Sequence, residues 1–259
     1  MSARVVALTL TPVKGLRVLA REQVVLGSGG VRENRRFFLI DEQQRMVNGK
    51  RHGALQAVVA DYSDSQRTLS LRFPDGTVVA GDVEPGRRLA ARFFSSTVAA
   101  TLVPGPWSAA LSEYVGEPLA LVESVSDWGA VDRGREGAVS LVSTASIERL
   151  GAAAGAAQPL DARRLRMLFE VDGVAAHEED GWLDRPLAIG GAVVMALGHV
   201  GRCAVTKRDP DSGATDLDTL AALASYRSVT DTTEPLGCGI HGRVVSAGTV
   251  RIGDAVELI

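Results

Sequence analysis

Short runs in which apolar and polar residues alternate dominate the first hundred positions of the chain. Residues 4–13 (RVVALTLTPV) and 21–30 (REQVVLGSGG) are such runs, and 35–47 (RRFFLIDEQQRMV) reads as a strand, a polar turn and a returning strand. Residues 69–83 (LSLRFPDGTVVAGDV) have a hairpin pattern around Pro-Asp-Gly. Successive strands with turns between them, and no long helical pattern, indicate a small antiparallel barrel or sandwich.

Helical spacing of apolar residues begins after position 105. It predicts helices over 106–116, 143–155 and 216–227. Ser143 or Thr144 can cap the second helix, because a side-chain oxygen at this position accepts a hydrogen bond from an unpaired backbone N–H of the first turn. The three predicted helices are few and lie far apart in a chain dominated by predicted strands, so the predicted fold is β-rich.

Alternation returns in the last third of the chain. It predicts strands over 166–173, 185–200, 202–209, 242–250 and 251–259. Residues 127–138 (DWGAVDRGREGA) are charged and rich in glycine, so we expect a connector there that crosses between two halves. The sequence thus predicts a mixed α+β, β-rich protein with an N-terminal antiparallel barrel half, 1–122, packed on a C-terminal barrel half with a few helices, 123–259.

Composition narrows the possible partners. The chain has 259 residues, of which 46% are apolar and 23% charged, and its formal net charge is −3. A weakly acidic chain has no overall field that attracts nucleic acid or anionic lipid. The first residues lack the long apolar core of a secretory signal, and no apolar run approaches the ~20 residues of a membrane span. We therefore expect a cytoplasmic protein without nucleic-acid partners.

Cys203 is one of two cysteines and lies in GRCAVTKRDPDSG, residues 201–213. Most free cysteines are small buried hydrophobes. Here, however, cations lie on both sides, which favours the thiolate form, and a strand that runs into a turn presents its side chain to a ligand. One thiolate is too few for structural zinc, and the four histidines show no paired spacing. A single thiolate suits a metal whose other ligands come from an organic cofactor.

Several other cations lie at the expected ends of strands and helices. They are Lys14 in TPVKG, Arg36 in NRRFF, and Arg163, Arg164 and Arg166 in DARRLRM. Most such side chains are solvated surface charges. A fixed cation beside apolar sequence can nevertheless bind a phosphate, for which arginine offers a planar fork and lysine a point charge.

Two acidic segments can each be interpreted either as a structural element or as a chemically active site. The carboxylates of EEDGW, residues 178–182, could act in acid–base catalysis, but a solvated loop anchored by Trp182 explains them equally simply. Residues 209–216 (DPDSGATD) lack the third acid and the distal glutamate of a calcium loop, so we interpret them as a turn.

Taken together, several motifs resemble the MOSC domain family. They are VKG, RRFFLID, VSLVSTASIERL, RRLRMLFEV, EEDGW with LAIGG, RCAVTKRDPDSG, LASYR and GTVRIGD. The chain is most similar to the two-part branch with an N-terminal β-barrel domain, which includes the mitochondrial amidoxime-reducing component and bacterial relatives. The resemblance covers nearly the whole chain, and RCAVTKRDPDSG with the downstream SYR is its most specific part.

The resemblance implies a molybdenum–pyranopterin cofactor with Cys203 as the protein's ligand to the metal. It implies cofactor contacts from Lys14, Gly15 and Arg36 in the first half, and from Ser143, Thr144, Arg164, Arg166, Arg202 and Thr206 in the second. Proton delivery would fall to Asp209, Asp211 or solvent. Pyridoxal phosphate binding enters only as a family-level association.

The chain also departs from the family pattern. Met167 and Leu168 replace a Pro-Asn pair, Gly15 stands where many members have serine, and Ile240 occupies a position that is commonly glutamine, with His241 beside it. These changes bear on cofactor binding and substrate preference. Cys238 matches no family ligand, and we expect it to be a packing residue.

The activity that the resemblance implies is reduction of small N-oxygenated compounds such as amidoximes and hydroxylamines. Because the one other cysteine is too few for an iron–sulfur cluster and no flavin or nicotinamide motif is present, electrons would come from a separate reductase of flavoprotein, cytochrome or ferredoxin type. A cofactor- or sulfur-carrying protein without reductase activity is the alternative. A protein-interaction domain with a vestigial site is a third possibility.

Overall fold

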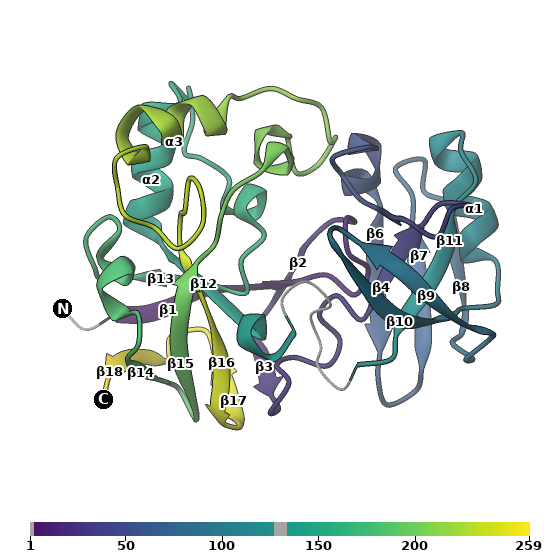
Figure 1. Ribbon diagram of the computed structural model, residues 1–259, viewed down its shortest axis with the longest axis horizontal. Helices are drawn as coiled ribbons and strands as arrows, with labels where there is room; N and C mark the ends of the chain where they lie inside the picture. Colours follow the sequence, from purple (N-terminus) through teal and green to yellow (C-terminus); the bar gives the residue numbers. More distant parts are fainter. Residues whose placement is uncertain (1–2, 127–133) are drawn as a thin grey trace.

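A computed structural model describes residues 3–126 and 134–259 of the chain. It is β-rich, with three α-helices in this part: α1 (Trp107–Val115), α2 (Thr144–Ala153) and α3 (Thr219–Arg227). Figure 1 shows two halves side by side, with α2 and α3 together at one end of the C-terminal half and α1 on the outer side of the N-terminal half. No helix in the described ranges has the length and apolar character needed to cross a membrane.

The C-terminal half is a closed barrel. Its strands are β1 (Ala3–Leu10), β13 (Phe169–Asp172), β12 (Val139–Ser143), β16 (Ile240–Ser246), β15 (Ala192–His199), β14 (Pro186–Ile189) and β18 (Ala255–Leu258), in their order around the barrel. β1 pairs with both β13 and β18, which closes the ring, and β2 (Leu19–Arg21) adds to its edge. A full ring leaves no unpaired edge among these seven strands.

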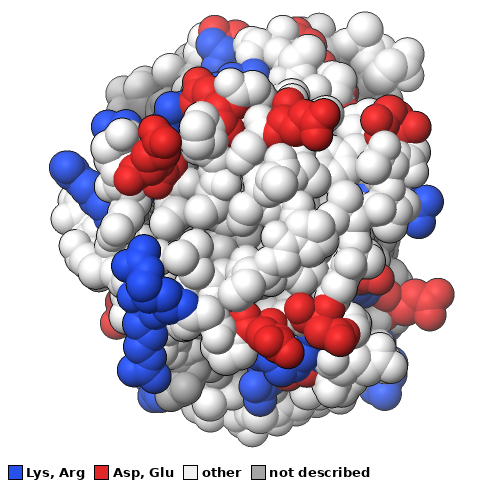
Figure 2. Space-filling view, turned by 90° about the vertical axis from the view of Figure 1, so that its right-hand side faces the viewer, with Lys and Arg blue, Asp and Glu red and all other residues white. Residues whose placement is uncertain are grey.

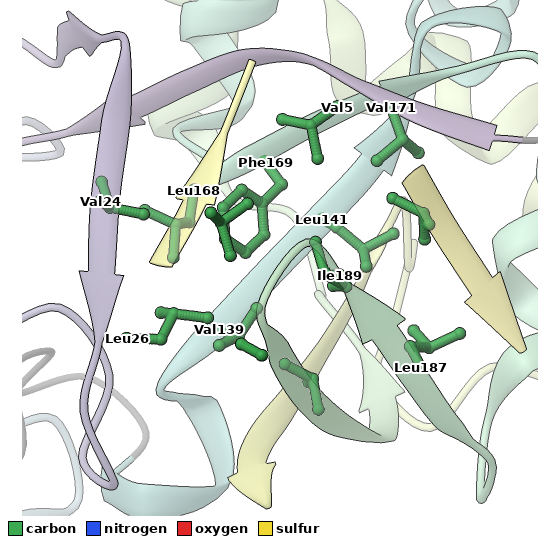
Figure 3. Packing of buried hydrophobic residues seen from close by; sticks show 14 of the residues in the cluster. Val5, Val24, Leu26, Val139, Leu141, Leu168, Phe169, Val171, Leu187 and Ile189 are labelled. Atoms are coloured by element: carbon green, nitrogen blue, oxygen red, sulfur yellow. The ribbon is translucent and has the colours of Figure 1, made fainter. Parts of the chain in front are cut away.

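Alternation along the strands fills the barrel with apolar side chains. Phe169, Leu141 and Ile189 are almost fully buried, and Figure 3 shows them converging with Val5 and Val171 on the barrel interior. Because successive side chains of a strand point to opposite faces, such runs bury every second residue. Burial of this cluster supplies most of the driving force for the half, at roughly 25 cal/mol per Å² of apolar area.

The N-terminal half has two smaller sheets. A curled sheet contains, in order, β5 (Met46–Val47), β4 (Phe37–Ile40), β11 (Ala120–Ser124), β10 (Ser96–Leu102) and β9 (Arg88–Phe93), and a three-stranded meander contains β6 (Val59–Ser63), β7 (Thr68–Arg72) and β8 (Val78–Asp82). A bridge between Arg45 and Arg92 brings the two ends of the curled sheet together. Trp107 of α1 is fully buried and donates its indole N–H to Leu69 at 3.2 Å, which fixes the helix on the meander.

The first strands of the chain do not stay with the rest of the N-terminal half. β1 is part of the C-terminal barrel, and β3 (Gln23–Leu26) pairs with β17 (Gly248–Arg251) near the other end of the chain. The boundary expected at residue 122 falls inside β11. The two halves are therefore interleaved, and β1 leads directly into the loop that carries Lys14.

The helices and most strands lie where the hydrophobic pattern predicts them. Ser143 rather than Thr144 is the N-cap of α2, and its Oγ accepts a hydrogen bond from Ser146 N at 3.1 Å. The strand predicted over 202–209 is wrong: Cys203 follows an irregular segment and caps a short 3-10 helix, Ala204–Lys207. Short alternation there reflects one helical turn, in which Thr206 alone is buried. Part of the connector expected over 127–138 lies outside the described residues, and its end forms a 3-10 turn, Gly134–Gly137.

Candidate functional site

A cavity of about 420 Å³ lies between the two halves. From the N-terminal half it is lined by Lys14, Gly15, Arg35, Asn48, Gly49, Lys50 and Phe94. From the C-terminal half it is lined by Gly137, Ser140, Arg164, Leu165, Arg166, Met167, Val200, Gly201, Arg202, Cys203, Val205, Thr206 and Glu234. Its volume lies within the range of small-molecule and cofactor sites, which commonly form where domains meet.

Cys203 reaches this cavity with a half-buried side chain. Its backbone is extended, and its carbonyl accepts hydrogen bonds at 3.0 Å from both the backbone N–H and the hydroxyl of Thr206. The Thr206 hydroxyl also contacts that of Thr219, the first residue of α3, at 2.7 Å. The thiol therefore sits on a turn that is anchored to a helix.

Arg202 fixes the chain on the other side of the thiol. Its guanidinium donates to the Leu165 carbonyl at 2.8 Å, to the Met167 sulfur at 3.1 Å and to the Cys238 carbonyl. These acceptors belong to two different segments of the C-terminal half. The arginine thus ties its own segment to two others, and a lysine, with a single nitrogen, could not reach acceptors in both.

Glu234 is the one acidic residue among the described residues that line the cavity. Its Oε2 accepts the backbone N–H of Gly201 at 2.9 Å, two residues before the thiol. The residue lies in the irregular segment between α3 and β16. Nothing in the local sequence pattern of that segment marks it as part of a site.

Two of the cations that line the cavity come from the segment 164–166. Arg164 makes a two-pronged ion pair with Asp216 at 2.7 and 2.5 Å, and its side chain is only 8% exposed. Hydrogen bonds to Asp216 raise the pKa of Arg164 above its usual value, so the guanidinium stays charged. Its Nε is buried and has no hydrogen-bond partner among the described residues. An unpaired buried donor is costly, and a polar group in the cavity would remove that cost.

Arg166 and Arg35 meet across the boundary between the halves. Arg166 has a left-handed backbone (φ 55°) and donates from its side chain to the Leu16 carbonyl at 2.5 Å. The Arg35 side chain donates to the Arg166 carbonyl at 2.7 Å. Two arginines are therefore held at the cavity by contacts that run in both directions between the halves.

Lys14 and Gly15 form the N-terminal wall. The Lys14 ammonium lies 5.5 Å from the centre of the Phe93 ring and 5.8 Å from that of Phe94. Gly15 has φ +96°, and a Cβ there would lie 3.2 Å from the Cα of Asn48. A serine at this position would be strained, which gives a physical reason for the glycine in this chain.

Three of the predicted cofactor residues lie outside the cavity and have other partners. Arg36 forms an ion pair with Glu123 at 2.9 Å, which Arg67 also contacts. The Ser143 side chain caps α2, and the Thr144 hydroxyl donates to Glu170 at 3.0 Å. We leave Arg36, Ser143 and Thr144 out of the proposed site.

The carboxyl group of Glu179 already lies at the N-terminus of α2. Glu179 is fully buried, and its Oε1 accepts the Ser143 backbone N–H at 3.2 Å and the Ser146 hydroxyl at 2.7 Å. This carboxyl group thus accepts a backbone N–H and a hydroxyl at the start of α2 that a phosphate would otherwise compete for. This explains one acid of EEDGW as a structural group.

Asp209 and Asp211 stabilise a turn and do not line the cavity. The Asp209 carboxylate accepts from the hydroxyl and backbone N–H of Ser212, and these bonds lower its pKa. Asp211 makes a two-pronged pair with Arg163 at 2.9 and 2.7 Å, which lowers the pKa of this carboxyl as well. Both are held as carboxylates, so neither is suited to donate a proton.

A cluster of polar side chains lies at the C-terminal end of α3, where Tyr226 and Arg227 contribute to it. Asp180 pairs with Arg227 at 2.7 Å, and His199 Nε2 lies 3.4 Å from the other oxygen of Asp180. The His177 ring packs on Tyr226 with centroids 5.7 Å apart. Burial, together with the charge of Arg227, lowers the pKa of His177 to about 4, and burial raises the pKa of Tyr226 to about 12. Both side chains are therefore neutral near pH 7.

Cys238 is fully buried and packs with Ile147, Leu150 and Leu223. Burial raises the pKa of its thiol, so it is a neutral packing group. Ile240 is buried in the barrel wall, and His241 Nδ1 lies 2.9 Å from the Glu136 carbonyl. Neither of these last two residues lines the cavity.

The donor set at the cavity suits a metal only if the metal brings other ligands. Among the described residues, no group of three or more histidine, cysteine or acidic side chains is placed to hold a metal ion. One thiol, that of Cys203, lines the cavity together with Lys14, Arg164, Arg166 and Arg202 among the described residues. A soft thiolate ligand beside fixed cations fits a sulfur-ligated metal carried by an anionic organic cofactor.

Comparison with protein families identifies the class. The model of the MOSC domain matches residues 129–257, and that of the MOSC N-terminal beta barrel domain matches residues 2–118. The chain therefore belongs to the MOSC family and has both domains of its two-part members. MOSC domains are related to the molybdenum cofactor sulfurase and are associated with binding of that cofactor. No curated protein matches the chain.

Solved structures show how far the fold is shared. YUAD protein from Bacillus subtilis is 13% identical over 100% of this chain and 96% of its own, with a TM-score of 0.51. YiiM from Geobacillus stearothermophilus is 16% identical over 49% of this chain and 56% of its own, with a TM-score of 0.36. At this identity, the likeness to YUAD concerns the fold alone.

Proposed function

We propose that the chain binds a molybdenum–pyranopterin cofactor in the cavity between its halves, with Cys203 as the protein's ligand to the metal, and reduces small N-hydroxylated compounds. The observation that carries this proposal is that the half-buried thiol of Cys203 lines the same cavity as six cations, with no second thiol among the described lining residues. When bound, the cofactor would supply two-electron redox chemistry at the metal.

The residues that would hold the cofactor are those the fold already fixes. Lys14, Arg35, Arg164 and Arg166 offer positive charge to a phosphate, and the buried Nε of Arg164 is a donor that such a group can satisfy. Arg202 and Thr206 act indirectly, because they position the backbone on either side of Cys203. The set is distributed over both halves, so cofactor binding would also hold the halves together.

The substrate would enter against an apolar part of the wall. Leu165, Met167, Val200 and Val205 line the same cavity as the thiol. These side chains would exclude water and accommodate a carbon skeleton, while the N–OH group faces Cys203. Met167, where the family pattern has proline, contributes both to this wall and to the hydrogen bonds of Arg202.

Reduction of an N-hydroxyl group breaks the N–O bond and releases the oxygen as water. It consumes two electrons and two protons, which must both be delivered to the site. Glu234 is our candidate for delivering a proton, because its carboxyl lines the cavity beside Gly201. The second thiol, Cys238, is buried and cannot serve as an electron relay at the surface. Electrons would therefore come from a separate reductase protein.

Metal analysis tests the proposal directly. The protein would be produced in a host that makes the cofactor, as wild type, Cys203→Ala and Cys238→Ala. We expect molybdenum in the wild type and in the Cys238→Ala control, and its loss in Cys203→Ala. Molybdenum retained at equal occupancy in Cys203→Ala would overturn the ligand assignment.

Turnover separates the reductase from its alternatives. Molybdenum-loaded wild type should reduce benzamidoxime when a chemical electron donor replaces the partner protein. Loaded protein without turnover would instead support a cofactor- or sulfur-carrying protein. Folded protein that never acquires the cofactor would leave an interaction domain with a vestigial site.

A further inference from the structure

A second cavity of about 320 Å³ lies beside the first. Both cavities are lined by Asn48, Lys50 and Phe94, so these three residues form a shared wall. The second cavity is completed by Arg45, Met46, Arg51 and Arg92. It opens where the ends of the curled sheet meet, since Arg92 donates its backbone N–H to Gln44 at 2.8 Å.

Among the described residues that line this second cavity, four are cations and none is acidic. Arg45 and Arg51 both pair with Asp41, at 2.9 and 3.0 Å, and Arg51 also pairs with Glu117. Lys50 and Arg92 have no ion-pair partner in the part of the chain that the structure describes. The cavity therefore has an excess of positive charge that a bound anion would neutralise.

The outer face of the N-terminal half offers a comparison for this group of cations. On the outer face of the N-terminal half, acidic and basic side chains are spread over a mostly uncharged surface (Figure 2). A surface that was basic all over would account for four cations around the second cavity, but this face is not basic all over. Their convergence next to the Cys203 cavity is a local feature.

Phe94 adds a flat apolar surface to the cationic hollow. It lies at the tip of the β9–β10 hairpin, is 54% exposed and has a left-handed backbone (φ 54°). The ammonium groups of Lys14 and Lys50 lie 5.8 and 5.5 Å from the centre of its ring. An exposed aromatic ring flanked by cations can stack on a planar group while the cations bind an adjacent phosphate.

We infer that the second cavity is an anion subsite for a phosphate-bearing group at one end of a molecule whose other end reaches the Cys203 cavity. The anion site stands on its own geometry, whereas the identity of the molecule rests on the proposed function. Such a group would be either a nucleotide attached to the pterin or the phosphate of a phosphorylated substrate. Arg92 and Lys50 would bind the phosphate, and Phe94 would pack on the neighbouring planar part.

Calorimetry on the purified full chain without cofactor tests the subsite. The probes are inorganic pyrophosphate, ADP and adenosine. The test variant carries the double substitution Lys50→Gln with Arg92→Gln. The matched control is Arg88→Gln, because Arg88 is an exposed arginine of β9 that lines neither cavity. We expect pyrophosphate and ADP to bind the wild type and the control, and to bind the double variant at least about tenfold more weakly. Phe94→Leu should weaken ADP more than pyrophosphate, and adenosine alone should bind least.

Wild type that binds no pyrophosphate, or a double variant with wild-type affinity, would overturn the inference. Cys203→Ala should retain pyrophosphate binding even though it loses molybdenum, so failure of the subsite and failure of the proposed function give different results. The source of the phosphate is resolved on cofactor-loaded protein. Nucleotide monophosphate released on acid hydrolysis in proportion to molybdenum identifies a pterin nucleotide. Its absence, with anion binding intact, identifies a phosphorylated substrate.

Discussion

The carboxylate of Glu234 accepts the backbone N–H of Gly201 at 2.9 Å, two residues before the thiol of Cys203. This bond ties a residue of the irregular segment before β16 to the loop that presents the thiol. The same carboxyl lines the cavity. A structural and a chemical role thus coincide in one side chain, and substitution can separate them.

Glu234→Gln should lower the turnover number with benzamidoxime by about 100-fold, because the amide can accept from Gly201 but cannot deliver a proton. Molybdenum content should stay at the wild-type level. Steady-state kinetics and metal analysis on the same preparation check both statements. Asp209→Asn is the control, since Asp209 lies outside the cavity, and its turnover should remain near that of the wild type. Unchanged turnover in Glu234→Gln would remove this residue from the reaction.

Arg202→Gln should destabilise the protein, because the shorter amide cannot reach the Leu165 and Cys238 carbonyls together. Leaving buried acceptors unpaired costs about 1–3 kcal/mol. Urea unfolding should report a loss of this size, and molybdenum occupancy should fall with it. Arg72 supplies the comparison, because it is exposed and has no ion pair with any residue of 3–126 or 134–259: Arg72→Gln should change the unfolding free energy by less than about 0.5 kcal/mol. Equal stability of the two variants would contradict the prediction.

Gly15→Ser tests the departure from the residue that many family members have. The backbone at this position has φ +96°, and a Cβ would press on Asn48 at 3.2 Å. The substitution should lower the free energy of unfolding by about 1–3 kcal/mol. Gly76→Ser is a useful comparison, because its φ is also positive (+89°) but a Cβ there meets nothing within 4 Å. If both variants lose the same stability, backbone strain alone accounts for Gly15 and the contact with Asn48 contributes nothing.

Acid should destabilise the protein partly through His177. Its folded pKa of about 4 lies below the usual value of 6.5, so the unfolded chain binds the proton more tightly. This contribution is complete above pH 6.5 and is lost as the pH falls from 6.5 towards 4. His177→Asn keeps a residue that tolerates the left-handed backbone at this position (φ 62°) and should flatten that part of the pH profile. Urea midpoints between pH 7 and 4.5 measure the effect, and an unchanged slope in the variant would exclude it.

Regular alternation made most of the fold predictable. The barrel strands and the three helices follow periods of two and of three to four residues, and Ser143 marks the start of α2 by its capping chemistry. The strand predicted after Arg202 was wrong because one turn of 3-10 helix also separates buried from exposed residues at short spacing. Pairing of β1 and β3 with the C-terminal strands could not be predicted, since local patterns do not identify a strand's partners.

The site residues that could be predicted from the sequence are those that lie together in a short motif. Cys203, Arg202 and Thr206 lie together in RCAVTKRD, and Arg164 and Arg166 in RRLRM, and all five line the cavity. Arg35 and Arg36 show the limit: the chain turns at Arg35 (φ 52°), which sends one guanidinium to Arg166 and the other to Glu123. Glu234 and Phe94 lie in an irregular segment and a hairpin tip, where no periodicity predicts which way a side chain points.

Because β1 is held between β13 and β18, the barrel cannot close until β18 (Ala255–Leu258) has left the ribosome. Most of the N-terminal half can form earlier, whereas β1 pairs with β13 and β18, which are synthesised more than 150 residues later. Contacts between such distant segments slow folding. A fragment that began after β11 would lack β1, one of the strands of its own barrel. Cutting the chain between the two family domains should therefore yield an unstable C-terminal product. Adding the N-terminal fragment should restore the stability of that product.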